Sequence, residues 1–221
     1  MVKPRVTETD EGITGEFEVR MYDQMQRSLR DKGYMETEDV IEAGVNSGLA
    51  LEIGPGPGYL GLEWLKSTEG TTLKGLEISD EMIAVAEKNA KEYGLQNRVQ
   101  YVKGDARKLP FEDAYFDGVF TNGSMHEWAE PEEVMNEAFR VLKPGGTFFI
   151  SDLRRDMNPL VKWYLWFMAK PKESRPGLIS SINAAYTPGE LRVLVDRTAL
   201  KGSRVGSNWI GVMVSGWKPM E

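Results

Sequence analysis

The chain has 221 residues, of which 41% are hydrophobic and 28% are charged, a composition typical of a globular protein with one large core. We therefore expect one domain over residues 1–221. A net charge of -7 argues against nucleic acid as a partner bound through a broad basic surface. The chain has no cysteine, which excludes disulfides, thiolate metal ligands and a cysteine nucleophile, and we expect no metal site.

The N-terminal region carries no targeting signal that we recognise. No apolar run follows Met1 to Arg5, and no stretch reaches the ~20 apolar residues of a membrane span. We therefore expect a cytoplasmic protein that has no membrane span. Residues 1–15 are polar and predict a mobile arm. Apolar residues at helical spacing then predict a helix from about Glu16 to Asp31, and a second short helix follows from about Glu36 to Ala43.

A strand and a glycine-rich turn come next. Residues Gly48 to Ile53 predict a buried strand, and a helical pattern resumes at Tyr59. Between them stand Gly54, Gly56 and Gly58, alternating with two prolines that stiffen the loop. A dinucleotide-binding turn requires a third glycine at the position that Tyr59 occupies, so this spacing disfavours a dinucleotide.

The E-x-G-x-G-x-G pattern that begins at Glu52 resembles the first motif of the class I S-adenosylmethionine (SAM) dependent methyltransferases. The resemblance extends to Ser151 and is strongest to the branch of small-molecule and quinone-biosynthesis methyltransferases. It implies an α/β, three-layer Rossmann-like fold with a mostly parallel seven-stranded sheet and an antiparallel edge strand. It also implies SAM as the cofactor, with Glu52, Gly54, Gly56 and Gly58 holding its methionine part.

The next two strands carry further candidates for the cofactor site. A strand from Thr71 to Ile78 places Glu77 near a carboxyl end, where its two acceptor oxygens suit the ribose diol, although a solvated strand-end charge is the alternative. Ser79 is the expected cap of the helix that follows. The third strand covers about Val99 to Lys103. By resemblance, Asp105 accepts from the adenine amino group. The other candidates for cofactor contact are Ile78, Met82, Ala106 and Asn122.

The fourth strand, Phe116 to Thr121, leads to residues 122–128, where the acceptor meets the cofactor in the family. His126 is the sole histidine, and it serves either as the general base or as a group that shapes the pocket. A helix from about Pro131 to Leu142 is expected to end at residues 143–146, before a fifth strand from Thr147 to Ser151. The N-terminal helices, about 16–43, form a lid in the family, which makes Tyr22 and Gln26 candidate substrate contacts; simple packing is the alternative.

The last third of the chain predicts an inserted helical cap at about 156–186. Its segment from Leu160 to Met168 is apolar except for Lys162, so it needs a partner: the active-site mouth, a second subunit or a membrane surface. We expect Trp163, Trp166 and Phe167 to cover a largely apolar acceptor pocket that Tyr186 also contacts, with a homodimer interface or core burial as alternatives. A helix begins at Thr187, and Trp209 to Trp217 form the final strand or strands.

The expected reaction is transfer of the SAM methyl group to a small-molecule acceptor with apolar character, by in-line attack on the sulfonium methyl. Many enzymes that methylate amino groups of nucleic acids and proteins carry a proline after the asparagine that follows the fourth strand. Here Gly123 follows Asn122, so the sequence lacks that signature. Two alternatives remain. One is a SAM-binding sensor or partner subunit without catalysis. The other is an NAD-dependent oxidoreductase, disfavoured by Tyr59 and by the lack of a Tyr-x-x-x-Lys pair.

Overall fold

One seven-stranded sheet organises the computed structural model, which describes residues 4–6, 8 and 12–220. In chain order the strands are β1 (Leu49–Ile53), β2 (Thr72–Glu77), β3 (Val99–Lys103), β4 (Phe116–Asn122), β5 (Leu142–Leu153), β6 (Arg204–Ser207) and β7 (Gly211–Trp217). Their order across the sheet is β3-β2-β1-β4-β5-β7-β6. From β1 the chain first adds β2 and β3 on one side and then adds β4 on the other side. A crevice for a ligand is expected beside such a change in the direction of strand order.

The sheet is mostly parallel, as predicted. Strands β1 to β5 pair in parallel, whereas β7 runs antiparallel to both β5 and β6. The antiparallel strand is therefore one position in from the edge, and β6 is the edge strand. The sequence analysis missed β6 and began the last strand too early, because Trp209 and Ile210 belong to the turn between β6 and β7.

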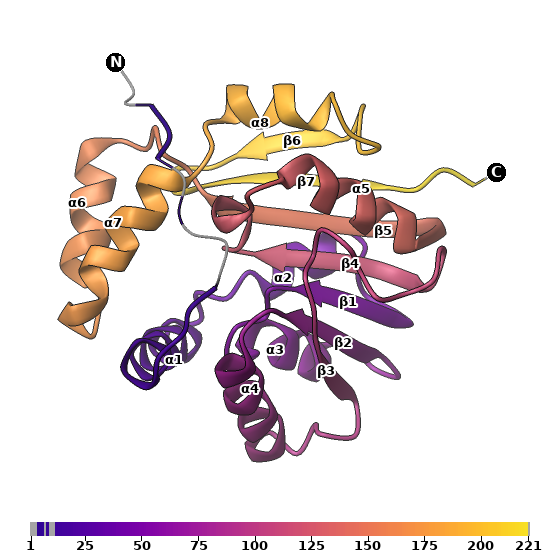
Figure 1. Ribbon diagram of the computed structural model, residues 1–221, viewed down its shortest axis with the longest axis horizontal. Coiled ribbons are helices and arrows are strands. Elements are labelled where there is room, and N and C mark those ends of the chain that lie inside the picture. The colour runs from indigo at the N-terminus through magenta and orange to yellow at the C-terminus, as the bar shows by residue number, and fades with distance from the viewer. Residues whose placement is uncertain (1–3, 7, 9–11, 221) are drawn as a thin grey trace.

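The described helices are α1 (Glu16–Asp31), α2 (Thr37–Glu42), α3 (Tyr59–Ser67), α4 (Asp80–Glu92), α5 (Pro131–Val141), α6 (Pro159–Met168), α7 (Arg175–Ala184) and α8 (Pro188–Val195), with the 3-10 turns η1 (Met125–Glu127) and η2 (Lys172–Ser174). Figure 1 shows helices on both faces of the sheet and α6 beside α7 at one end of the molecule. None of the described helices is long and apolar enough to cross a bilayer.

Two apolar clusters fill the space between the sheet and its helices. One contains Leu51, Val119 and Phe148 with residues of α5 and α8, and the other contains Ala50 and Phe120 with residues of α2 and α3. Neighbouring residues of one strand enter opposite clusters because side chains alternate across a sheet. The sheet is thus buried on both faces, which explains the near-continuous apolar runs of β1 and β4.

Three segments differ from the predictions. The residues from Lys143 to Gly146, expected to end a helix, lie within β5, where Gly145 and Gly146 exchange backbone hydrogen bonds with Lys218. The region at 156–186, expected to be one inserted helical cap, forms two helices, α6 and α7, with Pro176 in the first turn of α7, a position that tolerates proline. The described part of the N-terminal arm is held in place, since Arg5 donates to the carbonyls of His126 and Ala184.

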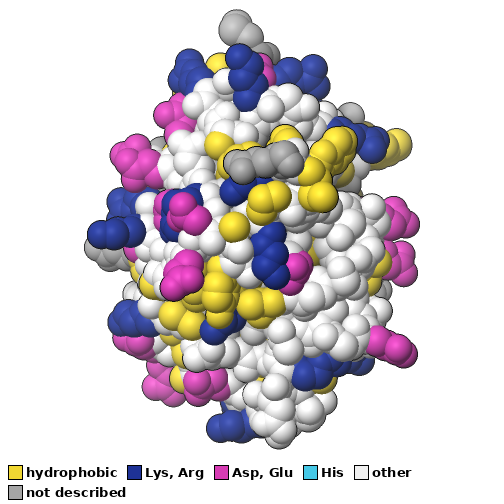
Figure 2. All heavy atoms as spheres, turned by 90° about the vertical axis from the view of Figure 1, so that its right-hand side faces the viewer, with side chains coloured by type: hydrophobic (Ala, Val, Ile, Leu, Met, Phe, Trp, Pro, Cys, Tyr) yellow, Lys and Arg dark blue, Asp and Glu magenta, His cyan; other side chains and the backbone are white. Residues whose placement is uncertain are grey.

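One face of the molecule shows how its charges are distributed. In Figure 2, which presents the right-hand side of Figure 1, lysines and arginines lie among aspartates and glutamates and form no continuous basic area on that face.

Candidate functional site

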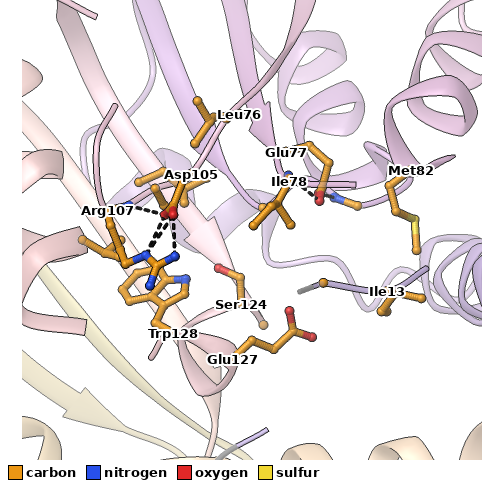
Figure 3. A pocket seen from close by; sticks show the side chains of 18 of the residues that line it. Ile13, Leu76, Glu77, Ile78, Met82, Asp105, Arg107, Ser124, Glu127 and Trp128 are labelled. Carbon is orange, nitrogen blue, oxygen red and sulfur yellow. Dashed lines mark hydrogen bonds and ion pairs between the residues drawn. The ribbon is translucent and has the colours of Figure 1, made fainter. Parts of the chain in front are cut away.

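A pocket lies beside the carboxyl ends of β1, β2 and β4. It is lined by Gly12, Ile13, Tyr22, Ile53, Gly54, Gly56, Leu76, Glu77, Ile78, Met82, Gly104, Asp105, Ala106, Arg107, Gly123, Ser124, Glu127, Trp128, Ala129 and Val134. In Figure 3, Glu77 and Met82 lie on one side, Asp105 and Trp128 lie on the other, and Glu127 projects toward the space between Ser124 and Ile13. The lining comes from six segments that are far apart in the chain.

The glycine loop forms the floor of this pocket. Gly54, Gly56 and Gly58 have φ values of 64°, 53° and 82°, in the left-handed region that favours glycine. A Cβ at Gly56 would lie 3.2 Å from the ring of Tyr22, so the glycine allows this ring to pack close to the loop. Gly58 does not line the pocket. It precedes α3, and a Cβ there would collide with the hydroxyl of Tyr101.

Glu52 lies outside the pocket lining, on the opposite face of β1 from Ile53. Burial raises the pKa of Glu52 to about 8, although the N–H of Gly61 donates to the carboxylate. Within the described part of the chain, its Oε2 is buried without a hydrogen-bond partner. The alternation of side chains along a strand turns Glu52 toward α3. Glu52 therefore faces α3 and does not line the pocket, and its contact with the cofactor stays a prediction.

Glu77 joins the second strand to the glycine loop. Its Oε2 accepts from the N–H of Gly56 at 2.9 Å, and its Oε1 accepts from the N–H groups of Ile78 and Ser79 at 2.9 and 3.1 Å. Burial raises its pKa in spite of these three donors. The carboxylate therefore fixes the loop and also lines the pocket, where it remains our candidate acceptor for the ribose hydroxyls.

Asp105 and Ala106 line the far end of the pocket, beside Gly104. The side chain of Asp105 is paired with Arg107, whose Nε and Nη2 lie 2.9 and 2.6 Å from Oδ2. The hydrogen bonds from Arg107 lower the pKa of Asp105. An adenine amino group at Asp105 would share the carboxylate with Arg107. Arg107 was not among the residues predicted from the sequence.

His126 is buried behind the pocket, at 5% exposure, in a network of carboxylates. Its Nδ1 lies 2.9 Å from Asp152, and its Nε2 lies 3.3 Å from Glu8 and 3.9 Å from Glu127. Burial alone would lower the pKa of His126, but the charge of Asp152 and hydrogen bonds to Asp152 and Glu8 raise it to about 10. This raised pKa favours the protonated ring at pH 7, and a role of His126 as base stays a prediction.

Glu127 is a second titratable side chain in the segment after β4. It lines the pocket, and its burial raises its pKa to about 7 against the opposing charge of His126. The only sequence signal for Glu127 is its place in the segment after the fourth strand. Glu8, His126 and Glu127 also offer ligand atoms within 4.8 Å of one another, a spacing that a metal ion could accept.

Some of the remaining candidate residues line the pocket, and others lie outside it. Ile78 and Met82 line the pocket, as does Tyr22, whose hydroxyl accepts from Gln26 at 2.9 Å. Gln26 is thus one step removed from the pocket. Asn122 is turned away, and its Nδ2 donates to Ser151 at 3.0 Å.

The helical region at 156–186 contributes none of the described pocket residues. Trp163 and Trp166 are 60% and 39% exposed, so neither covers the pocket in this structure. Tyr186 is buried, with the guanidinium of Arg5 4.4 Å from its ring centre. Its contact is with the N-terminal arm.

Comparisons with known proteins identify methyltransferases as the relatives of this chain. A family model described as a methyltransferase domain matches residues 51–150. Methyltransferase GfsG of Streptomyces halstedii is 35% identical over 127 residues, which cover 57% of this chain and 45% of that protein. Demethylmenaquinone methyltransferase of Protochlamydia amoebophila is 28% identical, over 87% of this chain and 86% of its own length. The chain spans less than half the length of several curated relatives that it matches.

A solved structure supports the same fold. The crystal structure of a protein from Methanococcus maripaludis, described as a putative S-adenosyl-L-methionine-dependent methyltransferase, aligns over 100% of this chain and 98% of its own, with a TM-score of 0.73 and 23% identity. Residues 51–150 thus belong to the methyltransferase domain family, and most of the chain is similar to a SAM-dependent methyltransferase in sequence and fold. SAM is the cofactor that this family uses, and the pocket fits it because glycines of the loop and the carboxylate of Glu77 line it together.

Proposed function

We propose that this protein transfers the methyl group of SAM to a small-molecule acceptor with apolar character. The observation that carries this proposal is that the glycine loop, Glu77, Glu127 and Trp128 line one pocket. Donor and acceptor that share one enclosed pocket can be aligned for in-line attack. SAM supplies an activated methyl group on a positively charged sulfur, which leaves as a neutral thioether.

The chain's own residues divide into two groups in this proposal. Gly54 and Gly56 give the cofactor access to backbone, Glu77 accepts from the ribose, and Asp105 with Ala106 receives the adenine. Ile78 and Met82 supply apolar contacts on the same wall. The carboxylates of Glu77 and Glu127 make the pocket favourable for a cation, which suits a sulfonium better than the phosphates of a dinucleotide.

Glu127 is the candidate group for proton transfer. A methyl acceptor that bears a proton must lose it, and a carboxylate with a pKa near 7 can take it at neutral pH. Protonated His126 stands behind Glu127, held by Asp152, and its positive charge favours the ionised form of Glu127. We therefore assign His126 a positioning role and Glu127 the role of base.

The apolar character of the acceptor rests on the pocket wall and on one relative. Ile13, Trp128 and Val134 line the pocket along with the aromatic ring of Tyr22. One relative is a demethylmenaquinone methyltransferase, whose name identifies a quinone as its acceptor. Quinones are largely apolar, and we extend that class of acceptor to this chain as part of the proposal.

Two measurements test the proposal. Calorimetry with SAM, S-adenosylhomocysteine and NAD should give binding of the first two and none of NAD. Turnover of methyl-labelled SAM against a panel of quinols, phenols and amines should then label an apolar acceptor. Binding of SAM without transfer to any member of the panel would favour the SAM-binding sensor, since a fold alone does not define a reaction.

A further inference from the structure

Helix α6 presents its apolar stripe to solvent. Leu160, Trp163, Tyr164 and Phe167 recur at the spacing that places residues on one face of a helix, and they are 75%, 60%, 52% and 56% exposed. The rings of Trp163 and Phe167 stack with centroids 5.6 Å apart. A surface helix normally turns such a stripe inward, so this one is ordered for contact with something outside the described chain.

The outer position of α6 in the molecule agrees with this orientation. Its other face packs on α7, which in turn contacts η1, and Figure 1 shows α6 as the outermost helix on that side. No residue of α6 is buried in the described structure. The stripe is therefore accessible without rearrangement of the sheet or of the pocket.

The charges around the stripe identify the kind of partner. Residues 157–189 contain Lys162, Lys170, Lys172 and Arg175 but one acidic residue, Glu173, in a chain whose net charge is -7. Lys170 and Lys172 are exposed in the turn that follows α6, and the guanidinium of Arg175 lies 4.1 Å from the ring centre of Trp166. Aromatic rings flanked by basic side chains are typical of helices that lie in the headgroup region of a membrane.

A second copy of the chain fits this surface less well. Two copies would bring the same basic residues together, and one ten-residue helix supplies far less than the roughly 20–30 residues a side of a stable interface. A lipid surface needs no matching shape, and its anionic headgroups complement the lysines. We propose that α6, with the turn at Lys170 and Lys172, docks this protein on the surface of a membrane that contains anionic lipids. The proposal does not depend on the identity of the methyl acceptor.

Vesicle sedimentation with the full chain tests this docking. The wild-type protein should sediment with phosphatidylcholine vesicles that contain phosphatidylglycerol, more weakly with phosphatidylcholine alone, and less as salt is raised. Trp163→Ala and Phe167→Ala should each weaken the partition by roughly tenfold or more, because each removes a large apolar side chain from the lipid. Neutralising both Lys170 and Lys172 to Gln should weaken it about fivefold for each charge.

Matched controls lie elsewhere on the surface. Trp209→Ala removes a tryptophan that is 81% exposed in the β6–β7 turn, and the pair Lys88→Gln and Lys201→Gln removes two exposed charges far from α6 in the chain. These variants should sediment as the wild type does. Circular dichroism should report the same unfolding temperature for the α6 variants, because their side chains are exposed.

Three results would overturn the proposal. The first is failure of the wild-type protein to sediment with either kind of vesicle. The second is sedimentation that the α6 and lysine variants leave unchanged. The third is a dimeric mass by light scattering that Trp163→Ala or Phe167→Ala halves, which would assign the stripe to a second copy of the chain.

Discussion

Two buried glutamates on neighbouring strands show how position decides the role of a side chain. Glu52 and Glu77 both stand near the carboxyl ends of their strands, and burial raises the pKa of both. Glu77 faces the pocket and binds three backbone N–H groups, whereas Glu52 faces α3. The sequence motif marks both residues, but it does not distinguish a ligand contact from a support.

Replacing Glu77 with Ala should weaken the binding of SAM by tenfold to a hundredfold, because a hydrogen bond to a charged group contributes ~1.5–3 kcal/mol. Calorimetric titration with SAM measures the effect. Glu77→Gln keeps one acceptor oxygen for the loop and should retain part of the affinity for SAM. The control variant is Glu87→Ala, on the exposed side of α4, which should retain all of that affinity. A folded Glu77→Ala protein with wild-type affinity would refute the assignment.

Replacing Glu127 with Gln should reduce turnover by ~10²-fold or more and leave the binding of SAM nearly unchanged, because the amide cannot accept the proton. In the wild type, the rate should rise as pH increases through about 7 and then level off, since the carboxylate with that pKa must be ionised to act. The pH–rate profile of kcat tests this directly. A profile that stays flat from pH 5.5 to 8.5 would argue against Glu127 as the base.

At the scale of elements, local signals predicted most of the fold. The helix Glu16–Asp31 and the strand Val99–Lys103 have the predicted bounds, because apolar spacing marks each. Ser79 caps α4 as expected, with its side chain accepting from the N–H of Met82. The strand β6 was missed because Arg204–Ser207 is partly exposed and lacks a clear alternation of apolar and polar residues.

The site was less predictable than the fold. The glycine loop and Glu77 could be found because they follow strands at family spacing. Glu8 and Arg5 could not, since their contacts with His126 join residues more than a hundred positions apart. The protonated state of His126 also depends on Asp152, which no local pattern places beside it. Long-range electrostatics, in general, has no short sequence signature.

The cap of α8 provides a test at this scale. Thr187 accepts from the N–H of Glu190 while the Glu190 carboxylate accepts from Thr187, a complete capping box. Thr187→Ala should cost ~0.5–2 kcal/mol and lower the melting temperature by about 2–4 °C for each kcal/mol. Thr187→Ser keeps the hydroxyl and should melt near the wild type. Equal melting of the Ala variant and the wild type would show that the box contributes nothing to stability.

The whole molecule should lose stability as pH rises above neutrality. Folded Glu52 keeps its proton to about pH 8 and folded His126 to about pH 10, whereas the ordinary values are 4.5 and 6.5. In both windows the folded state binds more protons than the unfolded state, so the free energy of unfolding falls as pH increases. Carboxylates with lowered pKa, such as Glu137 and Asp156, give the opposite slope below about pH 4.

Urea unfolding at a series of pH values from 4 to 10 measures this dependence. We expect a maximum near pH 4.5 and a continuous decline above it. Glu52→Gln should flatten the part of the decline up to pH 8, and His126→Asn the part from 6.5 to 10. Stability that increases between pH 7 and 10 would contradict the protonated state of His126.

The placement of β7 has a consequence for biosynthesis. This strand follows the other six in the chain, yet it pairs with β5 inside the sheet and separates it from β6. While the chain emerges from the ribosome, β5 forms an open edge of the sheet. Seven of its residues stay without a partner strand until Gly211–Trp217 has been synthesised. Nascent chains released before that point would carry an exposed apolar edge, the kind of surface that recruits chaperones or seeds aggregation.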